Sequence, residues 1–189
     1  ELNISKAFDE KKIISTIEEE LNDVYRDFNF EPSQRSNMVE EMRFVDAISD
    51  SLKESMNKYN DLVLMGQDIA EYGGVFKITK GFLDLFGKER VRNTPICESS
   101  IIEVAMGLSI CNRKSIVELQ FSDFISSGFN PVVNYLAKIH YRWGQNADIV
   151  LRMPCGAGVG AGPFHSQTNE AWFTKTAGLI VVYLSLIHI

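Results

Sequence analysis

The chain has 189 residues, of which 45% are apolar and 23% charged, and its formal net charge at pH 7 is −6. This length holds one domain with a sizeable core and an appendage, and the composition is that of a globular protein. No apolar run reaches the roughly 18 residues that cross a bilayer, and no basic stripe is present to neutralise phosphates. We therefore expect neither a membrane nor a nucleic acid as a partner.

The first residues and the cysteines bear on the compartment. The N-terminal stretch ELNISKAFDEKK lacks the apolar segment and cleavage site of an export signal. Cys97, Cys111 and Cys155 form no CxxC pair, so neither a disulfide framework nor a structural metal site is predicted. We expect a cytoplasmic protein.

Residues 1–41 are expected to be a linker or the tail of an upstream alpha-type region. Residues 1–40 hold ten acidic and five basic side chains and show little sustained apolar periodicity. Within them, ISKAFDEKKIISTIEEEL has the spacing of a short amphipathic helix.

From Met42 the sequence alternates between helical and strand patterns. The helical patterns are FVDAISDSLKESMNKY, IIEVAMGLSIC and FNPVVNYLAKIHYRW. The strand patterns are DLVLMGQD, SIVELQF, ADIVLRM and LIVVYL, and these compact apolar runs suit a parallel sheet. This order predicts an α/β fold, a parallel sheet with helices on both faces. In such sheets, ligands bind beyond the carboxyl ends of the strands.

A glycine-rich stretch, GAGVGAGPFHSQTNEAW, follows the strand pattern ADIVLRM. Gly156, Gly158 and Ala161 have the G-x-G-x-x-A spacing of a dinucleotide-binding loop. A pyrophosphate needs helix amides directly after the glycines, and here Pro163 to His165 intervene. No acidic residue follows LIVVYL to bind a ribose, so a nicotinamide cofactor is not predicted.

His165 stands beyond a strand end, where an imidazole can bind an anion or move a proton. The helix expected after it has Ser166 as its N-cap and Glu170 in its first turn. A capping or packing role for His165 is the alternative that the residues alone leave open. Of the other histidines, His140 has the surroundings of a structural residue, and His188 lies in the C-terminal tail.

Glu98 lies between an extended segment and an apolar helix, in the stretch NTPICESSIIEVAM. A carboxyl group that is removed from water must pair, accept helix amides or keep a proton, and such groups often serve proton chemistry. A helix cap or first-turn acid is the plainer alternative.

Several long motifs occur in one order between Met42 and Tyr183. They are GQDIAEYGGVFKITKG, FGKERVRNTPICESSI, VELQFSDFISSGFNPVVNYLAK, YRWG and VLRMPCGAGVGAGPFHSQTNEAWF. Together they resemble the beta chain of the thiamine-diphosphate-dependent 2-oxo acid dehydrogenases of the pyruvate and branched-chain type. The resemblance implies a transketolase-like, pyrimidine-binding domain over residues 42–183. The preceding EELNDVYRDFNFEP resembles the junction of bacterial proteins in which alpha and beta chains are fused, so a fragment of a fused protein is expected.

The resemblance assigns roles to five positions. Glu98 matches the glutamate that hydrogen-bonds N1′ of the cofactor's aminopyrimidine and promotes loss of the thiazolium C2 proton. Phe124 matches an aromatic residue stacked on the pyrimidine, often tyrosine in the family, Gln120 matches a polar contact and Ile96 an apolar or backbone contact. Core packing is the alternative for these three. His165, in the H-S-Q motif, matches the catalytic histidine that faces the substrate and the lipoyl group.

The resemblance also implies partners. In the family, a G-D-G…N motif on the alpha chain holds the cofactor's diphosphate and magnesium, and this sequence has no such motif. The expected partners are an alpha-type chain or domain, a second beta-type chain and the lipoyl domain of the acyltransferase, with no metal ligand on this chain. The implied activity is oxidative decarboxylation of a 2-oxo acid, branched-chain or pyruvate, with reductive acylation of lipoamide. The isolated chain is expected to be inactive.

The C-terminal end departs from the family pattern. After GLIVVY the family continues through a proline-containing turn and further helices into a second domain, whereas this sequence ends in LSLIHI. We therefore expect C-terminal truncation and a non-native tail over residues 184–189. Two other functions stay open: an enzyme of the transketolase or deoxyxylulose-phosphate synthase type, and a noncatalytic assembly module.

Overall fold

A computed structural model describes residues 2–27, 31–32 and 40–185. The strands are β1 (Val63–Gly66), β2 (Val91–Asn93), β3 (Ser115–Glu118) and β4 (Ile149–Arg152). The α-helices are α1 (Leu2–Asp9), α2 (Ile17–Val24), α3 (Phe44–Lys58), α4 (Phe82–Phe86), α5 (Glu98–Ile110) and α6 (Ile139–Trp143). The remaining turns are the 3₁₀-helices Ser122–Ser126, Ala157–Val159 and Glu170–Trp172 and the π-helix Pro131–Leu136. No helix within the described ranges is both long and apolar enough to cross a membrane.

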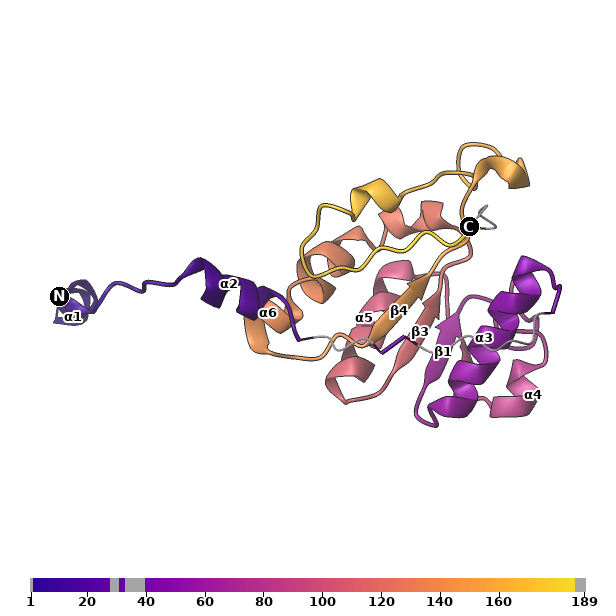
Figure 1. The fold of residues 1–189 in the computed structure, drawn as a ribbon, viewed down its shortest axis with the longest axis horizontal. Helices are drawn as coiled ribbons and strands as arrows, with labels where there is room; N and C mark the ends of the chain where they lie inside the picture. Colours follow the sequence, from indigo (N-terminus) through magenta and orange to yellow (C-terminus); the bar gives the residue numbers. More distant parts are fainter. Residues whose placement is uncertain (1, 28–30, 33–39, 186–189) are drawn as a thin grey trace.

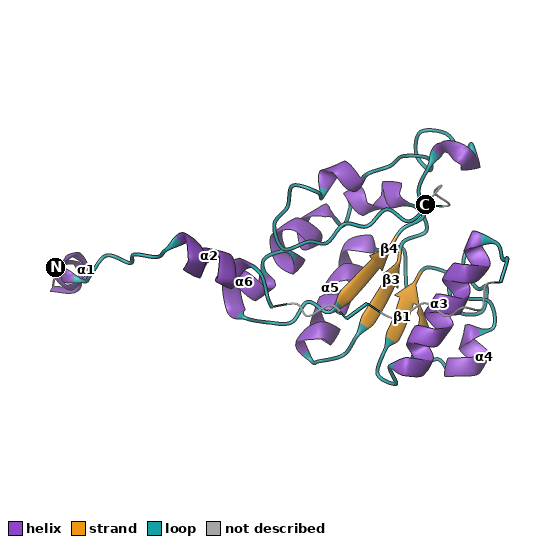
Figure 2. Cartoon of the chain, viewed as in Figure 1, coloured by secondary structure: helices purple, strands orange, loops and turns teal. Residues whose placement is uncertain are grey.

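The four strands form one parallel sheet in the order β2-β1-β3-β4. Figure 2 shows β1, β3 and β4 side by side in this order. Leu64 pairs with Ile116, and Met65 pairs with Val117. Because neighbouring residues of a strand point to opposite faces, the two pairs enter different cores. Leu64 and Ile116 pack with α3 and α4, whereas Met65 and Val117 pack with α5. The predicted α/β fold, a parallel sheet with helices on both faces, is confirmed.

Three strand patterns became strands, but the fourth did not. LIVVYL, residues 179–184, forms no ladder with β4, although β4 is an edge strand of the sheet. Ile180 and Val182 are largely exposed, because without a partner strand nothing covers their side chains. The prediction of a strand here was wrong. Strand β2 was missed because it is only three residues long and has a single buried side chain, Val91.

The stretch FNPVVNYLAKIHYRW is interrupted instead of forming one helix. It forms the π-helix Pro131–Leu136, then a turn, then α6. The amide of Ala137 donates to the carbonyl of Val132, five residues earlier, at 3.0 Å, which is the bond that widens a helical turn. Lys138, with φ of −118°, ends this turn before α6 begins.

The expected N-terminal helix is split in two. Thr16 starts α2 with a capping box: its hydroxyl accepts from the Glu19 amide at 3.2 Å, and the Glu19 carboxylate accepts from the Thr16 amide at 2.7 Å. Because this cap fixes a new helix start, α1 and α2 are separate helices. Figure 1 shows both extending away from the sheet, with α2 beside α6, where the Tyr141 hydroxyl donates to Glu20 at 3.1 Å. Within residues 184–189, which were expected to be a tail, His188 and the rest of 186–189 lie outside the described residues.

Gly178 makes a close backbone contact that no larger residue fits. A Cβ on Gly178 would lie 2.0 Å from the carbonyl oxygen of Ala137, and its φ of +88° is left-handed. Gly81 has a similar φ of +81° with open space around it. We expect Gly178→Ala to destabilise the protein by about 1–3 kcal/mol more than Gly81→Ala, since only the first adds overpacking.

Thermal unfolding of the two variants beside the parent protein measures this difference. At about 2–4 °C per kcal/mol for a chain of this size, the Gly178→Ala midpoint should fall clearly below that of Gly81→Ala. Equal midpoints would show that the close approach of Gly178 to Ala137 does not exist.

Candidate active site

Polar and aromatic residues follow the carboxyl ends of all four strands. The residues concerned are Gln67 and Asp68 after β1, Glu98 after β2, Gln120, Phe121 and Phe124 after β3, and His165 after β4. In a parallel sheet these ends meet at one edge, which is where ligands of α/β proteins bind. The contacts below join these residues into one cluster.

Glu98 is the first residue of α5 and is half-buried. Its Oε1 accepts a hydrogen bond from Gln67 Nε2 at 3.0 Å, and its Oε2 accepts a long one, 3.3 Å, from the Ser127 hydroxyl. Both donors belong to other segments, so the carboxylate is held by tertiary contacts, while its place in the first turn also suits a negative charge. The carboxylate keeps acceptor capacity and access to solvent.

Gln67 and Asp68 connect Glu98 to Gln120. Gln67 is 5% exposed and directly follows β1. Asp68, next in the chain, accepts from Gln120 Nε2 at 3.3 Å. Asp68 has a left-handed φ of +56°, which is uncommon for a residue with a side chain, and its carbonyl accepts from the Gly74 amide at 2.8 Å. The turn after β1 thus places the Gln67 amide and the Asp68 carboxylate beside the polar side chains that follow β2 and β3.

An aromatic cluster surrounds His165. Its ring centroid lies 5.0 Å from that of Phe121 and 5.3 Å from that of Phe124, with interplanar angles of 86° and 82°. Phe121 and Phe124 are 5.8 Å apart and also nearly perpendicular. These edge-to-face contacts orient the imidazole. The single hydroxyl proton of Ser127 is shared between the Phe124 carbonyl at 2.9 Å and Glu98 Oε2 at 3.3 Å, so the aromatic cluster and the carboxylate are neighbours.

The structure therefore brings four of the five predicted site residues together: Glu98, Gln120, Phe124 and His165. Ile96 differs. It is 84% exposed, so the alternative of core packing for this residue was wrong. The cause is local: β2 ends at Asn93 on the edge of the sheet, and the chain then crosses open surface until α5 begins.

No helix begins at Ser166. Only a 3₁₀ turn at Glu170–Trp172 follows, with Asn169 before it, so the expected N-cap was wrong. The backbone of Gln167 is engaged elsewhere: its N–H donates to Asp123 at 3.2 Å, and its carbonyl accepts from the Ser122 hydroxyl at 2.8 Å. Backbone groups used in these tertiary bonds are not free to build a helical turn.

The pattern of residues 40–185 matches the family model described as the transketolase, pyrimidine binding domain. The chain belongs to this family of pyrimidine-binding domains. The match covers the whole sheet and every residue of the cluster at its carboxyl edge.

Three curated proteins are similar in sequence to this pyrimidine-binding domain. The 2-oxoisovalerate dehydrogenase subunit beta of Bacillus subtilis is 40% identical over 143 residues, 75% of this chain and 44% of the relative. The 3-methyl-2-oxobutanoate dehydrogenase subunit beta of Mycobacterium tuberculosis is 36% identical over 78% of this chain and 43% of its own length. The pyruvate dehydrogenase E1 component subunit beta of Leifsonia xyli is 34% identical over 84% and 47%. The chain thus spans less than half the length of these relatives.

Four residues of the cluster in this pyrimidine-binding domain were not predicted from the sequence: Gln67, Asp68, Phe121 and Ser127. Gln67 and Asp68 carried a usable signal, because they are the polar residues directly after a buried strand. Ser127 carried no such signal, because its contact with Glu98 depends on the preceding 3₁₀-helix, which shows no periodicity in the sequence.

Below the cluster, a buried ion pair joins the ends of β3 and β4. Arg152 Nη2 lies 2.6 Å from Glu118 Oε2, and the two side chains are 18% and 3% exposed. They are direct partners in the parallel register. Removing a carboxylate this far from water is tolerable only because a cation faces it.

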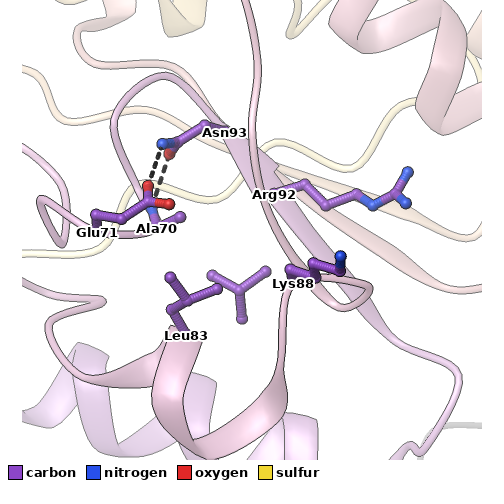
Figure 3. A pocket seen from close by; sticks show the side chains of 7 residues that line it. Ala70, Glu71, Leu83, Lys88, Arg92 and Asn93 are labelled. Carbon is purple, nitrogen blue, oxygen red and sulfur yellow. Dashed lines mark hydrogen bonds between the residues drawn. The ribbon is translucent and has the colours of Figure 1, made fainter.

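Two hollows of the pyrimidine-binding domain lie beside β2, and neither is lined by Glu98, Gln120, Phe124 or His165. One, about 290 Å³, has Glu71, Lys88 and Arg92 around it; Figure 3 shows Asn93 bridging Glu71 and the Ala70 backbone within it. The other is about 450 Å³. In the first, the Glu71 carboxylate already accepts a hydrogen bond from Asn93 Nδ2 at 2.7 Å.

Proposed function

We propose that this chain supplies the pyrimidine-binding half of the active site in the decarboxylating component of a 2-oxo acid dehydrogenase. The observation that carries the proposal is the Glu98 carboxylate at the carboxyl edge of the sheet, tied through Gln67 and Ser127 to the aromatic cluster of His165. Membership of the pyrimidine-binding family and the beta-subunit names of the relatives support it.

The residues present fit an aminopyrimidine. Such a ring needs a carboxylate at its N1′, an aromatic face and polar partners at its edge, and Glu98, Phe124 and Gln120 offer these three groups within one cluster. Thiamine diphosphate, the cofactor that contains this ring, would supply a carbon nucleophile and accept the electron pair that decarboxylation releases. In Phe124 the tyrosine hydroxyl often present in the family is missing, but the stacking face is retained.

Two residues would carry the proton chemistry. Glu98 would share a proton with N1′ of the pyrimidine, and Gln67 keeps the carboxylate oriented for this by donating to its other oxygen. His165 would bind the carboxylate of the 2-oxo acid or move a proton during acyl transfer to lipoamide, because an imidazole nitrogen can donate or accept a hydrogen bond. Phe121 and Phe124 would exclude water around it.

The diphosphate and its magnesium are assigned to an alpha-type partner or region. A diphosphate needs cations or free helix amides, and the cluster presents instead the carboxylates of Asp68 and Glu98. A second beta-type chain and the lipoyl domain of the acyltransferase complete the proposed assembly, in a cytoplasmic enzyme. The proposal includes an origin in a fused alpha-beta polypeptide.

The test is reconstitution. Decarboxylation of 3-methyl-2-oxobutanoate and of pyruvate is measured with thiamine diphosphate and magnesium, using this chain alone and then with an alpha-type chain or the fused polypeptide. We expect no turnover from the chain alone and turnover from the combination, with the branched-chain acid as the better substrate. Full turnover by the isolated chain would contradict the division of the site.

The same preparation separates the other two functions. A transketolase-like enzyme would transfer a two-carbon ketol unit between sugar phosphates instead of acylating lipoamide. An assembly module would leave activity unchanged when Glu98 is replaced by glutamine.

A further inference from the structure

The loop that carries His165 has little structure of its own. Between β4 and the turn at Glu170 it contains the single 3₁₀ turn Ala157–Val159, and the Gln167 side chain donates to the Pro163 carbonyl at 2.8 Å. Gly156, Gly160 and Gly162 have left-handed φ values of +112°, +66° and +77°. Such a glycine-rich segment pays a large entropy cost to adopt one conformation. Something outside the loop must therefore fix the imidazole.

The 3₁₀-helix Ser122–Ser126 makes the contacts that hold this loop. Asp123 Oδ1 accepts from the Gln167 amide at 3.2 Å, and the Ser122 hydroxyl donates to the Gln167 carbonyl at 2.8 Å. Asn169 Nδ2 donates to the Ser122 carbonyl at 3.4 Å. All three side chains, Ser122, Asp123 and Asn169, are buried, and we call them the loop anchor.

Two members of the loop anchor, Ser122 and Asp123, belong to the same short segment as the aromatic partners of His165. Phe121 and Phe124 flank Ser122 and Asp123 in sequence, and both rings contact the imidazole. The segment thus holds the loop at the backbone of residue 167 and at the side chain of residue 165. These two points fix both the position and the tilt of the imidazole.

We propose that Asp123 is a positioning residue for His165: by binding the Gln167 amide it holds the imidazole of an otherwise loose loop at the carboxyl edge of the sheet. The inference rests on the proposed function only for the consequence on catalysis. The anchoring itself concerns this chain alone.

Asp123 offers a matched pair of variants. Its Oδ1 makes the bond to Gln167, and its buried Oδ2 has no hydrogen-bond partner among the described residues. Asparagine keeps an oxygen acceptor of the same shape, so Asp123→Asn retains the bond, whereas Asp123→Ala leaves the Gln167 amide without its protein acceptor. Ser126→Ala is the control, because it removes a hydroxyl of the same 3₁₀-helix that donates to the Asp123 carbonyl at 3.2 Å and not to the loop.

The first measurement is amide hydrogen exchange over residues 156–169 in the complete enzyme, this chain with its alpha-type partner or region. A lost hydrogen bond with an orphaned donor should raise exchange in Asp123→Ala by about tenfold, with Asp123→Asn and Ser126→Ala near the parent. If Asp123→Ala fails to fold, Ser122→Ala, which removes the other bond to Gln167, should raise exchange several-fold. Unchanged exchange in both alanine variants would overturn the proposal.

The second measurement is a double-mutant cycle on activity. If Asp123 acts through His165, Asp123→Ala lowers kcat in the parent protein but has no further effect in a His165→Ala background. An equal loss in both backgrounds would overturn the positioning role. Faster exchange in Asp123→Ala, together with no decarboxylase activity in the parent or any variant, would support the anchoring while refuting the proposed function.

Discussion

Replacing Glu98 by glutamine in the complete enzyme is expected to lower the rate of 2-oxo acid decarboxylation by about 10²–10⁴-fold, the range of a lost general acid-base group. Glutamine keeps the side-chain shape and an oxygen that accepts from Gln67, so the hydrogen bond at 3.0 Å survives. What it loses is the ability to share a proton with N1′ of a pyrimidine. The measurement is kcat with thiamine diphosphate at saturation.

Thermal unfolding provides the control for this variant. Glu98 is half-buried, and a glutamine at this position can accept from Gln67 and donate to the Ser127 hydroxyl oxygen. The midpoint of Glu98→Gln should therefore match that of the parent. Ser99→Ala, on the next residue of α5, serves as a neighbouring variant that should keep full activity. A Glu98→Gln enzyme with near-parent turnover would favour the assembly module over the enzyme.

The second large effect concerns stability. Arg152→Met should destabilise the domain by about 3–5 kcal/mol, because it leaves the carboxylate of Glu118 buried without a cation. Glu118→Gln should cost less, since the remaining Arg152 is 18% exposed and can reach water. The double variant Glu118→Leu/Arg152→Met removes both charges and should recover most of the loss.

Thermal unfolding of the three variants distinguishes these cases. The predicted order of midpoints, from lowest, is Arg152→Met, Glu118→Gln and then the double variant, which should lie nearest the parent. If Arg152→Met unfolds at the parent's midpoint, the pair is not the buried contact between β3 and β4 that the 2.6 Å separation describes.

The sheet was predictable because its central strands carry compact, mainly apolar runs. SIVELQF and DLVLMGQD are covered on both faces, so both faces of each strand are mainly apolar, and the buried Glu118 of SIVELQF is paired with Arg152. LIVVYL is equally apolar, yet forms no strand, since pairing depends on a neighbour that the run itself does not specify. The opposite error occurred at edge strand β2, which was not predicted: three residues with one buried side chain are too few to show an apolar periodicity.

The main residues of the candidate site were predictable, but the residues that hydrogen-bond to them and hold them in place were not. Glu98 and His165 stood out because they follow strand ends, and the resemblance gave them roles. The bonds from Gln67 and Ser127 to Glu98 join segments about thirty residues apart, and the Asp123 bond to Gln167 joins segments 44 apart. The strand end marks Gln67 as a candidate, but nothing local marks which residues pair in these bonds, and the Asp123 bond displaced the helix expected after Ser166.

The central claim is that Glu98 promotes proton loss from a thiamine cofactor bound beside this sheet edge. The most direct measurement is the rate of hydrogen-deuterium exchange at C2 of thiamine diphosphate bound to the complete enzyme, compared between the parent and Glu98→Gln. We predict exchange at least about 10²-fold slower in the variant, with the cofactor still bound. Equal exchange rates in the two proteins would contradict the claim.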